Sequence, residues 1–375
     1  MSKLKVMTIV GTRPEIIRLS EVIKCCDKYF EHLLVHTGQN YDYSLNGVFF
    51  KDLELREPNY YLDSVGKDLG ETMGNIIAKS YELMENTRPD AVLLLGDTNS
   101  ALSAISAKRL KIPIFHMEAG NRCWDWNVSE MINRKIVDHI SDINMPYTEH
   151  SRRYLLSEGI DGKTMFVTGS PMREVLFAHK DGIEASKVLD KLHLERNKYI
   201  LLSAHREENI DNEDNFISLM EAVNSIARKY NMPVIYSCHP RSKKHIEARG
   251  FVFDERVRAL EPFGFLDYNK LQKNAYCVLS DSGTLSEESA MLGFAGVLIR
   301  TSTERPEVLD KGSVVIGGIK AEDVQRGMEL AVAMRDNGEE TVMASDYADT
   351  NVSVKVVKLI ESYTKIVNET VWLKR

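Results

Sequence analysis

Cys277-Val-Leu-Ser-Asp-Ser-Gly-Thr-Leu-Ser-Glu-Glu-Ser-Ala290 is the stretch from which the fold of this chain can be worked out. Its beginning predicts a short apolar strand over residues 276–279, and its end has the composition of a helix. Ser282, Gly283 and Thr284 lie between the two, where the backbone N–H groups of a helix's first turn lack intrahelical partners. Such a turn can bind a phosphate or diphosphate group. Taken alone, it is better explained as a Ser or Thr cap without a ligand, because such caps are common.

The composition is that of a globular protein with room for two domains. The chain has 375 residues, of which 43% are hydrophobic and 27% charged. With 48 Lys and Arg against 55 Asp and Glu the net charge is −7, and no basic run indicates nucleic-acid binding. No apolar segment has the length of a membrane span or a signal peptide. The five cysteines lack Cys-x-x-Cys spacing, which argues against a disulfide framework, so we expect a cytoplasmic protein that binds neither nucleic acid nor membrane.

Predicted strands and helices alternate along the chain in two blocks. The predicted strands are residues 5–10, 33–36, 91–95 and 112–116 in the first block and 199–203, 233–237, 276–279 and 297–299 in the second. Helices are expected around residues 71–85 and 100–110. This alternation predicts parallel, doubly wound sheets. We therefore expect an α/β protein with two Rossmann-like domains, residues 1–172 and 173–351, and a last helix at about 352–375 that packs back on the first domain.

Polar residues gather where the predicted strands end. They are Arg13, Asp97 and Glu118 in the first block and His205, His239, Ser282–Thr284, Glu288 and Arg305 in the second. Ligands of open parallel sheets bind outside the carboxyl ends of the strands, so we expect the site there, in the cleft between the two domains. Arg13 near a helix start works against the helix dipole unless an anionic ligand is bound close by. Asp97 can equally be an Asx turn or a ligand contact.

Three further positions carry candidate acid–base groups. Glu118 directly follows an apolar strand and is expected to be half buried, a setting typical of catalytic carboxyl groups. His205 also ends an apolar strand, which favours a site residue over a core histidine. Glu130, by contrast, is explained on its own as a first-turn glutamate that stabilises its helix. The chain has no metal-ligand spacing and no Gly-x-Gly-x-x-Gly motif, so we expect neither a metal nor a dinucleotide cofactor.

Eight short blocks, spread over almost the whole chain, together resemble a known family. The blocks are Gly11-Thr-Arg-Pro-Glu15, Thr37-Gly-Gln39, Gly96-Asp-Thr98, His116-Met-Glu-Ala-Gly120, Glu130 with Asn133-Arg134, His205-Arg206-Glu207, Ser280-Asp-Ser-Gly283 with Glu287-Glu288, and Glu304-Arg-Pro-Glu307. In this order they resemble the bacterial non-hydrolysing UDP-N-acetylglucosamine 2-epimerase family. The resemblance implies two Rossmann-like domains in a glycosyltransferase-B arrangement, a homodimer, and a UDP-sugar substrate.

Within that family, three segments are similar to the UDP-N-acetyl-L-fucosamine synthase branch. They are Val35-His-Thr-Gly-Gln-Asn-Tyr-Asp-Tyr43, His116-Met-Glu-Ala-Gly-Asn-Arg-Cys123 and Asn133-Arg-Lys-Ile-Val-Asp-His139. The glucosamine epimerases more often read Glu-Ala-Gly-Leu-Arg-Thr-Gly in the second segment. The branch epimerises carbon 2 of UDP-2-acetamido-2,6-dideoxy-L-talose to give UDP-N-acetyl-L-fucosamine for capsule or O-antigen synthesis. UDP-N-acetylglucosamine is the alternative substrate, and a glycosyltransferase of the same fold or a non-catalytic UDP-sugar sensor is the alternative class of protein.

The resemblance also implies a role for each candidate residue. The family eliminates UDP across carbons 1 and 2 and adds it back, which requires acid–base groups and a firm hold on UDP but no cofactor. By resemblance, the catalytic residues are Asp97, Glu118, Glu130 and His205, the diphosphate is held by Ser282, Gly283 and Thr284 with Arg13 near the phosphate, and the ribose is held by Glu288. Either Arg134 or Arg206 supplies a counter-charge, and His239 and Arg305 complete the expected substrate-binding residues.

The segment 124–131 departs from the pattern of the branch. Trp124-Asp125-Trp126 stands where the branch usually reads Phe-Asp-Gln, and Ser129-Glu130-Met131 stands where it reads Pro-Glu-Glu. Glu130 is kept, but the neighbouring carboxylate is lost and aromatic bulk is gained. The resemblance therefore leaves open the conformation of this loop and the identity of the sugar.

Overall fold

The computed structural model describes residues 3–38, 47–124, 126, 128, 130–339 and 342–374. The chain forms two compact units, Met1–Ala178 with Ser345–Arg375, and His179–Ala344. The first unit extends beyond the predicted boundary at residue 172, because helix α7 (Met172–Ala178) packs against α1 (Arg13–Tyr29). The C-terminal segment of this unit also begins before the predicted residue 352, since Ser170 N–H donates a 3.2 Å hydrogen bond to the carbonyl oxygen of Asp346.

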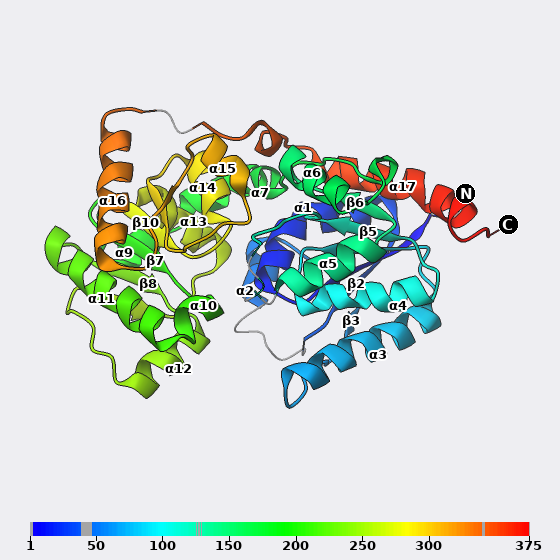
Figure 1. Ribbon diagram of the computed structural model, residues 1–375, viewed down its shortest axis with the longest axis horizontal. Helices are drawn as coiled ribbons and strands as arrows, with labels where there is room; N and C mark the ends of the chain where they lie inside the picture. The colour runs from blue at the N-terminus through cyan, green and yellow to red at the C-terminus, as the bar shows by residue number, and fades with distance from the viewer. Residues whose placement is uncertain are drawn as a thin grey trace. The chain divides into compact units, whose positions relative to one another are not determined.

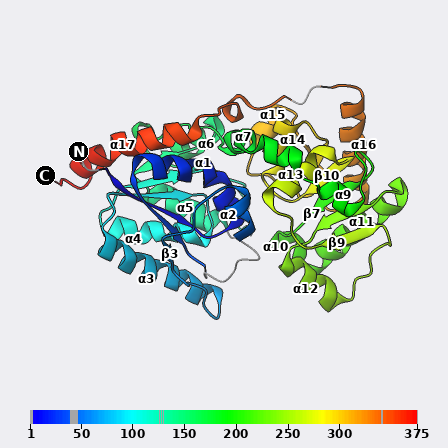
Figure 2. The same cartoon turned by 180° about the vertical axis from the view of Figure 1, so that it is seen from behind.

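The first unit is built on a six-stranded parallel sheet with the strand order β3-β2-β1-β4-β5-β6. Its strands are β1 (Lys5–Val10), β2 (Glu31–His36), β3 (Tyr60–Tyr61), β4 (Ala91–Leu95), β5 (Ile114–Met117) and β6 (Ile143–Met145). Its other helices are α2 (Val48–Asp52), α3 (Leu69–Thr87), α4 (Ser103–Arg109), α5 (Glu130–Ile140), α6 (Glu149–Ser157) and α17 (Val352–Thr370). Helices α1 and α17 pack together on one face of the sheet, and α3 and α4 pack together on the other (Figure 1, Figure 2).

Helix α1 shows how the local sequence sets this arrangement. It begins after the extended N-cap Thr12. Ile16, Leu19, Val22 and Ile23 recur at helical spacing and are all buried. Each such side chain contributes about 1.5–3 kcal/mol when it leaves water, so this stripe fixes α1 against the sheet and α17.

The second unit repeats the plan with the strand order β12-β11-β10-β7-β8-β9, again all parallel. Its strands are β7 (Ile200–Ser203), β8 (Val234–Ser237), β9 (Val257–Leu260), β10 (Cys277–Ser280), β11 (Gly296–Leu298) and β12 (Val315–Ile316). Its helices are α8 (Lys180–Ala185), α9 (Val188–Leu192), α10 (Glu207–Ile210), α11 (Glu213–Tyr230), α12 (Pro240–Arg249), α13 (Phe265–Asn274), α14 (Leu285–Leu292), α15 (Pro306–Asp310) and α16 (Ala321–Asp336). The prediction of two α/β, Rossmann-like domains with parallel sheets is therefore confirmed.

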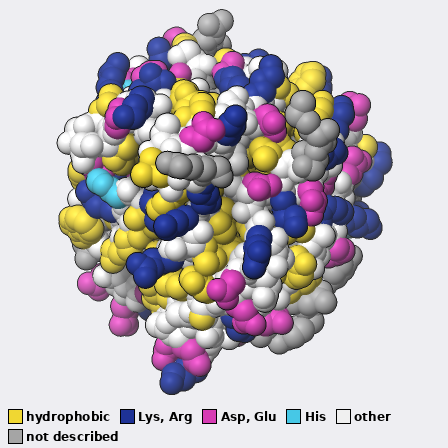
Figure 3. All heavy atoms as spheres, turned by 90° about the vertical axis from the view of Figure 1, so that its right-hand side faces the viewer, with side chains coloured by type: hydrophobic (Ala, Val, Ile, Leu, Met, Phe, Trp, Pro, Cys, Tyr) yellow, Lys and Arg dark blue, Asp and Glu magenta, His cyan; other side chains and the backbone are white. Residues whose placement is uncertain are grey.

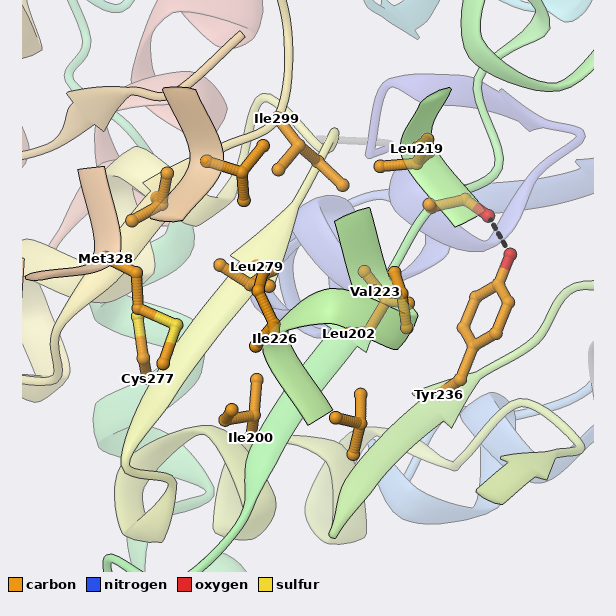
Figure 4. Close-up of a cluster of buried hydrophobic side chains, with 14 of the residues drawn as sticks. Ile200, Leu202, Leu219, Val223, Ile226, Tyr236, Cys277, Leu279, Ile299 and Met328 are labelled. Carbon is orange, nitrogen blue, oxygen red and sulfur yellow. Dashed lines mark hydrogen bonds between the residues drawn. The ribbon is translucent and has the colours of Figure 1, made fainter. Parts of the chain in front are cut away.

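The core of the second unit joins its sheet to helices α11 and α16 (Figure 4). Ile200 and Leu202 of β7 belong to the same buried cluster as Val223 of α11. Tyr236 brings a polar group into this cluster, and its Oη donates a 2.8 Å hydrogen bond to the carbonyl oxygen of Ala204 (Figure 4). The core therefore holds the chain just beyond the carboxyl end of β7.

The sequence predicts the inner strands of both sheets and misses the edge strands β3, β6, β9 and β12. Inner parallel strands are covered on both faces and read as continuous apolar runs, such as Ala91–Leu95. The edge strands lack this signal, since β3 has only two residues and β9 is the half-exposed Val-Arg-Ala-Leu. These edge segments adopt strand conformation because they pair with a neighbouring strand, and their own sequences do not indicate it.

The surface carries charges of both signs. On the face shown in Figure 3, basic and acidic side chains are interspersed around apolar patches. Among the helices of the described ranges, none combines the length and the apolar character needed to cross a membrane.

Candidate active site

A buried glutamate organises the turn between β1 and α1. Glu15 Oε2 accepts hydrogen bonds from the N–H group (2.7 Å) and the hydroxyl (2.8 Å) of Thr12, and its other carboxylate oxygen accepts one from the Ser100 hydroxyl. Burial raises the pKa of Glu15, and these hydrogen bonds oppose that effect only in part. Arg13 is the first residue of α1, and its guanidinium lies 5.7 Å from the centre of the Phe49 ring. The turn thus places Arg13 at the carboxyl end of β1.

Glu118 directly follows β5 in an unusual backbone conformation. Its φ of +60° is rare for a residue with a side chain, and such strain is concentrated at functional sites. The residue is 8% exposed, which is more buried than predicted. Its carboxylate pairs with Arg18 of α1 and accepts a 3.2 Å hydrogen bond from Asn121 Nδ2. A Cβ atom at Gly96 would lie 3.4 Å from Glu118 Oε2, so this carboxylate lies beside the turn that carries Asp97.

Asp97 is held by the first turns of helix α5. Arg134 Nε donates a 2.6 Å hydrogen bond to Asp97 Oδ2, and Asn133 Nδ2 donates one of 2.9 Å to the Asp97 carbonyl oxygen. Glu130 begins α5 one turn before Arg134, so the two side chains lie on the same face of the helix. The first unit therefore gathers Asp97, Glu118 and Glu130 at the carboxyl ends of the adjacent strands β4 and β5.

Asp138 of α5 is the centre of a buried charge network beside these residues. It accepts hydrogen bonds from Gly120 N–H (3.2 Å) and Arg122 Nη1 (2.8 Å), and its Oδ1 lies 3.0 Å from His116 Nδ1. The other ring nitrogen of His116 lies 2.8 Å from the carbonyl oxygen of Gly96. Burial disfavours the charged imidazolium, but the hydrogen bond and charge of Asp138 outweigh burial and raise the pKa of His116. One carboxylate thereby ties the loop after β5 to the turn after β4.

Arg122 extends this network toward the surface. Its side chain is fully buried, and its Nη2 lies 2.7 Å from Glu158 Oε2. Lys135 and His139 contact the same carboxylate at 2.9 and 3.2 Å. The hydrogen bond from Arg122, followed by those from Lys135 and His139, lowers the pKa of Glu158 to about 2. These ion pairs fix the loop that begins at Glu118.

In the second unit, Asp281 connects the ends of β10 and β7. It is fully buried directly after β10, and its Oδ2 accepts hydrogen bonds from the N–H groups of His205 (2.8 Å) and Arg206 (2.9 Å). The side chain of His205 is 42% exposed, so the predicted site histidine is not part of the core. Its ring centre lies 6.0 Å from that of His239, which accepts a hydrogen bond from Arg241 N–H at the start of α12. The predicted His205 and His239 are therefore neighbours.

The turn Ser282–Thr284 does not form an ordinary helix cap. The N-cap of α14 is Thr284, and it makes no side-chain capping hydrogen bond. Instead, the Ser282 and Thr284 hydroxyls lie 2.9 Å apart, and Thr284 N–H donates to Ser282 Oγ at 3.4 Å. A Cβ atom at Gly283 would lie only 2.6 Å from Glu304 Oε1, so the backbone here packs closely against a carboxylate.

The charged residues near this turn are arranged in buried ion pairs. Glu304 lies 2.7 Å from Arg300 Nη1 and 3.2 Å from Arg206 Nη2. Arg305 Nη1 lies 2.6 Å from Glu287 Oε1, and both side chains are buried. Arg134 is thus paired with Asp97 in the first unit, and Arg206 is paired with Glu304 in the second.

Glu288, the predicted ribose contact, lies one turn into α14 and is 8% exposed. Its Oε2 accepts a 2.6 Å hydrogen bond from Gln272 Nε2 of α13. Such a contact fixes the orientation of the carboxylate. Glu288 thus shares the carboxyl end of β10 with Ser282–Thr284.

Three residues of these sites are not among those that the sequence predicts. Arg18 lies within the apolar stripe of α1, where a charge is unexpected, and this was the only local signal of its partner Glu118. Asp281 lies in the stretch Cys277–Ala290 directly after a strand, which is the position that the other candidate residues also have. Asp138 carries no comparable signal, because its partners come from distant parts of the chain.

Some predictions concern residues that the structure does not describe. Residues 39–43 of the segment similar to the fucosamine branch, and Asp125 and Ser129 of the altered loop, lie outside the described ranges. Within those ranges, no group of three His, Cys, Asp or Glu side chains could hold a metal ion.

The two Rossmann-like domains, with acid–base and hydroxyl groups at their strand ends, define an α/β enzyme of the two-domain type. Residues 24–361 match the family model of UDP-N-acetylglucosamine 2-epimerase. A solved structure of UDP-N-acetylglucosamine 2-epimerase from Rickettsia bellii is 46% identical with a TM-score of 0.92, over 99% of this chain and 100% of that one. The Methanocaldococcus jannaschii enzyme in complex with UDP-GlcNAc and UDP is 30% identical with a TM-score of 0.89, over 96% and 99% of the two chains. The UDP-2,3-diacetamido-2,3-dideoxy-D-glucuronate 2-epimerase of Pseudomonas aeruginosa is 30% identical over 95% of this chain and 100% of its own length.

The chain belongs to the UDP-N-acetylglucosamine 2-epimerase family. It is accordingly an isomerase of the epimerase class, as predicted.

Proposed function

We propose that the protein converts UDP-2-acetamido-2,6-dideoxy-L-talose into UDP-N-acetyl-L-fucosamine. Carbon 2 of this sugar has no neighbouring carbonyl group, so its proton cannot be removed to form an enolate. Instead, a base takes the proton from carbon 2 while the bond between carbon 1 and the UDP oxygen breaks, which leaves a glycal and UDP. UDP then adds back to carbon 1, and a proton reaches carbon 2 from the opposite face. Atoms and electrons balance without a redox step.

The two units suit different parts of this reaction. In the first, Asp97, Glu118 and Glu130 offer carboxyl groups that can exchange protons with carbon 2 and the bridging oxygen. In the second, Ser282–Thr284 offers hydroxyl and backbone donors to a diphosphate, and His205 offers a further acid–base group.

A contact of Asn121 is the observation that carries the choice of sugar. Asn121 Nδ2 donates to Glu118 at 3.2 Å, and Asn121 Oδ1 accepts a 3.0 Å hydrogen bond from the Ser151 hydroxyl. The Leu that glucosamine epimerases more often carry at this position could make neither contact. Asn121 therefore gives Glu118 an orientation that belongs to the fucosamine-type sequence, which supports the 6-deoxy-talose substrate.

Solvent-deuterium exchange tests both the mechanism and the sugar. The purified enzyme is incubated in deuterated water with the UDP-linked 6-deoxy-talose substrate and, separately, with UDP-N-acetylglucosamine. We expect one deuterium at carbon 2 of UDP-N-acetyl-L-fucosamine and a faster reaction with the talose substrate. Product without carbon-2 deuterium from either sugar would rule out elimination and re-addition.

UDP-N-acetylglucosamine is the second candidate substrate, because the family model and the Rickettsia relative carry its name. Turnover of UDP-N-acetylglucosamine at or above the rate of the talose substrate would decide for it. The Asn121→Leu variant sharpens the comparison, since it should slow the talose reaction more than the glucosamine reaction. A Ser151→Ala variant is the matched control and should have the smaller effect, because it removes the outer hydrogen bond to Asn121 and a 3.3 Å contact with Thr148 Oγ1 but keeps the hydrogen bond from Asn121 to Glu118.

A further inference from the structure

Asp281 presents one satisfied and one unsatisfied carboxylate oxygen. Oδ2 accepts hydrogen bonds from His205 N–H, Arg206 N–H and Asn209 Nδ2 at 2.8, 2.9 and 3.2 Å. Oδ1 is buried and accepts no hydrogen bond within the described part of the chain. The imidazole Nδ1 of His205 lies 3.5 Å from this oxygen. A buried, ionisable oxygen without a partner is costly, which points to a partner that completes the contact in another state of the site.

The surroundings hold this geometry from both sides. Strands β10 and β7 are hydrogen-bonded neighbours, with Ser280 opposite Ser203, so Asp281 and His205 leave the sheet side by side. The carbonyl oxygen of Ala204, just before His205, accepts hydrogen bonds from Tyr236 Oη (2.8 Å) and Ser242 Oγ (3.0 Å). Thus the backbone is fixed on the sheet side while the His205 ring itself is 42% exposed.

We propose that Asp281 is a positioning residue that sets the tautomer and orientation of the His205 ring. With the proton on Nδ1, the ring donates toward Asp281 Oδ1 and turns the lone pair of Nε2 outward as a base. When Nε2 takes a proton, the resulting imidazolium faces a carboxylate, which stabilises it. When Nε2 returns the proton, the ring becomes neutral again and no other bond changes. The inference rests on the proposed function, in which His205 exchanges a proton with the sugar nucleotide.

The shape of Asp281 allows a specific test through Asp281→Asn. The asparagine carbonyl oxygen can replace Oδ2 and keep its three hydrogen bonds, which leaves the NH2 group facing His205 Nδ1. That NH2 group is a donor, so Nδ1 must become the acceptor and the ring proton moves to Nε2. We expect kcat to fall on the order of 10²–10⁴-fold, the range lost when an acid–base group is removed. The KM for the UDP-sugar and the affinity for UDP should stay unchanged.

The tautomer is measured directly on ¹⁵N-histidine-labelled full-length protein. His205→Gln identifies the ring signals, which should show protonated Nδ1 in the wild type and protonated Nε2 in Asp281→Asn. Asn209→Ala is the matched control, because it removes one hydrogen bond to Oδ2 and one to the Ile299 carbonyl oxygen, both of 3.2 Å, without altering the side of Asp281 that faces His205. It should keep the wild-type tautomer and nearly the wild-type kcat.

Each outcome is decisive. An unchanged tautomer or an unchanged kcat in Asp281→Asn overturns the proposal. Loss of UDP affinity in parallel with kcat also overturns it, because Asp281 would then merely hold the loop together. If the wild type places no deuterium at carbon 2, the proposed function fails, whereas the tautomer experiment still decides whether Asp281 orients His205.

Discussion

Glu158→Gln should destabilise the first unit at neutral pH but not in strong acid. Arg122 Nη2 lies 2.7 Å from the carboxylate and Lys135 Nζ lies 2.9 Å from it, and together with His139 they lower its pKa from 4.5 to about 2. At about 1.36 kcal/mol per pH unit, this shift corresponds to roughly 3 kcal/mol of stability. Lys135 and His139 are partly exposed, so screening by water reduces the expected loss to about 2 kcal/mol.

The pH window follows from the direction of the shift. The pKa of Glu158 is lower in the folded than in the unfolded chain, so the stabilisation is complete above pH 4.5 and disappears as the pH falls to about 2. Hydrogen exchange of the α6 amides under increasing urea reports the stability of the first unit by itself. Wild type and Glu158→Gln should differ at about pH 7 and converge toward about pH 2.

A surface ion pair provides the control for this experiment. Glu369 lies 3.6 Å from Lys365 on α17 and its side chain is 55% exposed, so Glu369→Gln should cost less than about 0.5 kcal/mol. If Glu158→Gln cost no more than this control, or cost the same at about pH 7 and pH 2, the ion-pair account of Glu158 would be refuted.

Two further substitutions test the site itself. Arg18→Met should lower kcat by about 10²-fold while UDP affinity is kept, because Glu118 loses the partner that positions it; steady-state kinetics and calorimetry with UDP separate the two effects. Gly283→Ala should weaken UDP binding, since the added Cβ would lie 2.6 Å from Glu304 Oε1. Gly74→Ala is the control, because no atom lies within 4 Å of the added Cβ. It should leave UDP binding unchanged and raise the free energy of unfolding by up to about 1 kcal/mol. Unaltered kcat in the first variant, or unaltered calorimetric affinity in the second, would contradict these expectations.

The fold could be predicted because its inner strands are buried on both faces. Runs such as Lys5–Val10 and Ala91–Leu95 have the same bounds in the sequence prediction and in the structure. Edge strands have no such constraint, and Tyr60–Tyr61 becomes a strand only by pairing with β2. The boundary between the domains differs from the predicted residue 172 for a related reason. Helix α7 belongs to the first unit because it packs on α1, and this contact joins residues far apart in the sequence.

The sequence indicates at which strand ends the candidate residues lie, but it does not indicate which residues contact them. Strand ends are visible in the sequence, so Asp97, Glu118 and His205 could be selected there. Their partners come from other segments, and Arg18 is 100 residues away from Glu118. Nothing in the local sequence of either residue indicates such a pair, and the same holds for the pairs of Arg134 with Asp97 and of Arg206 with Glu304.

The ion pairs around Glu304 affect how strongly a diphosphate would be held at Ser282–Thr284. Glu304 lies against Gly283 and already engages Arg206 and Arg300, so a ligand at the proposed site shares these cations with a carboxylate instead of meeting them uncompensated. Because the two arginines already pair with Glu304, their affinity for a diphosphate is lower than it would be without this carboxylate. In the proposed reaction, UDP that stays bound while the sugar is detached would then be held by the hydroxyl and backbone donors of the turn, whose hydrogen bonds are short-range and directional. A Ser282→Ala variant should therefore release free UDP and glycal during turnover, and weaker binding without such release would count against this division of roles.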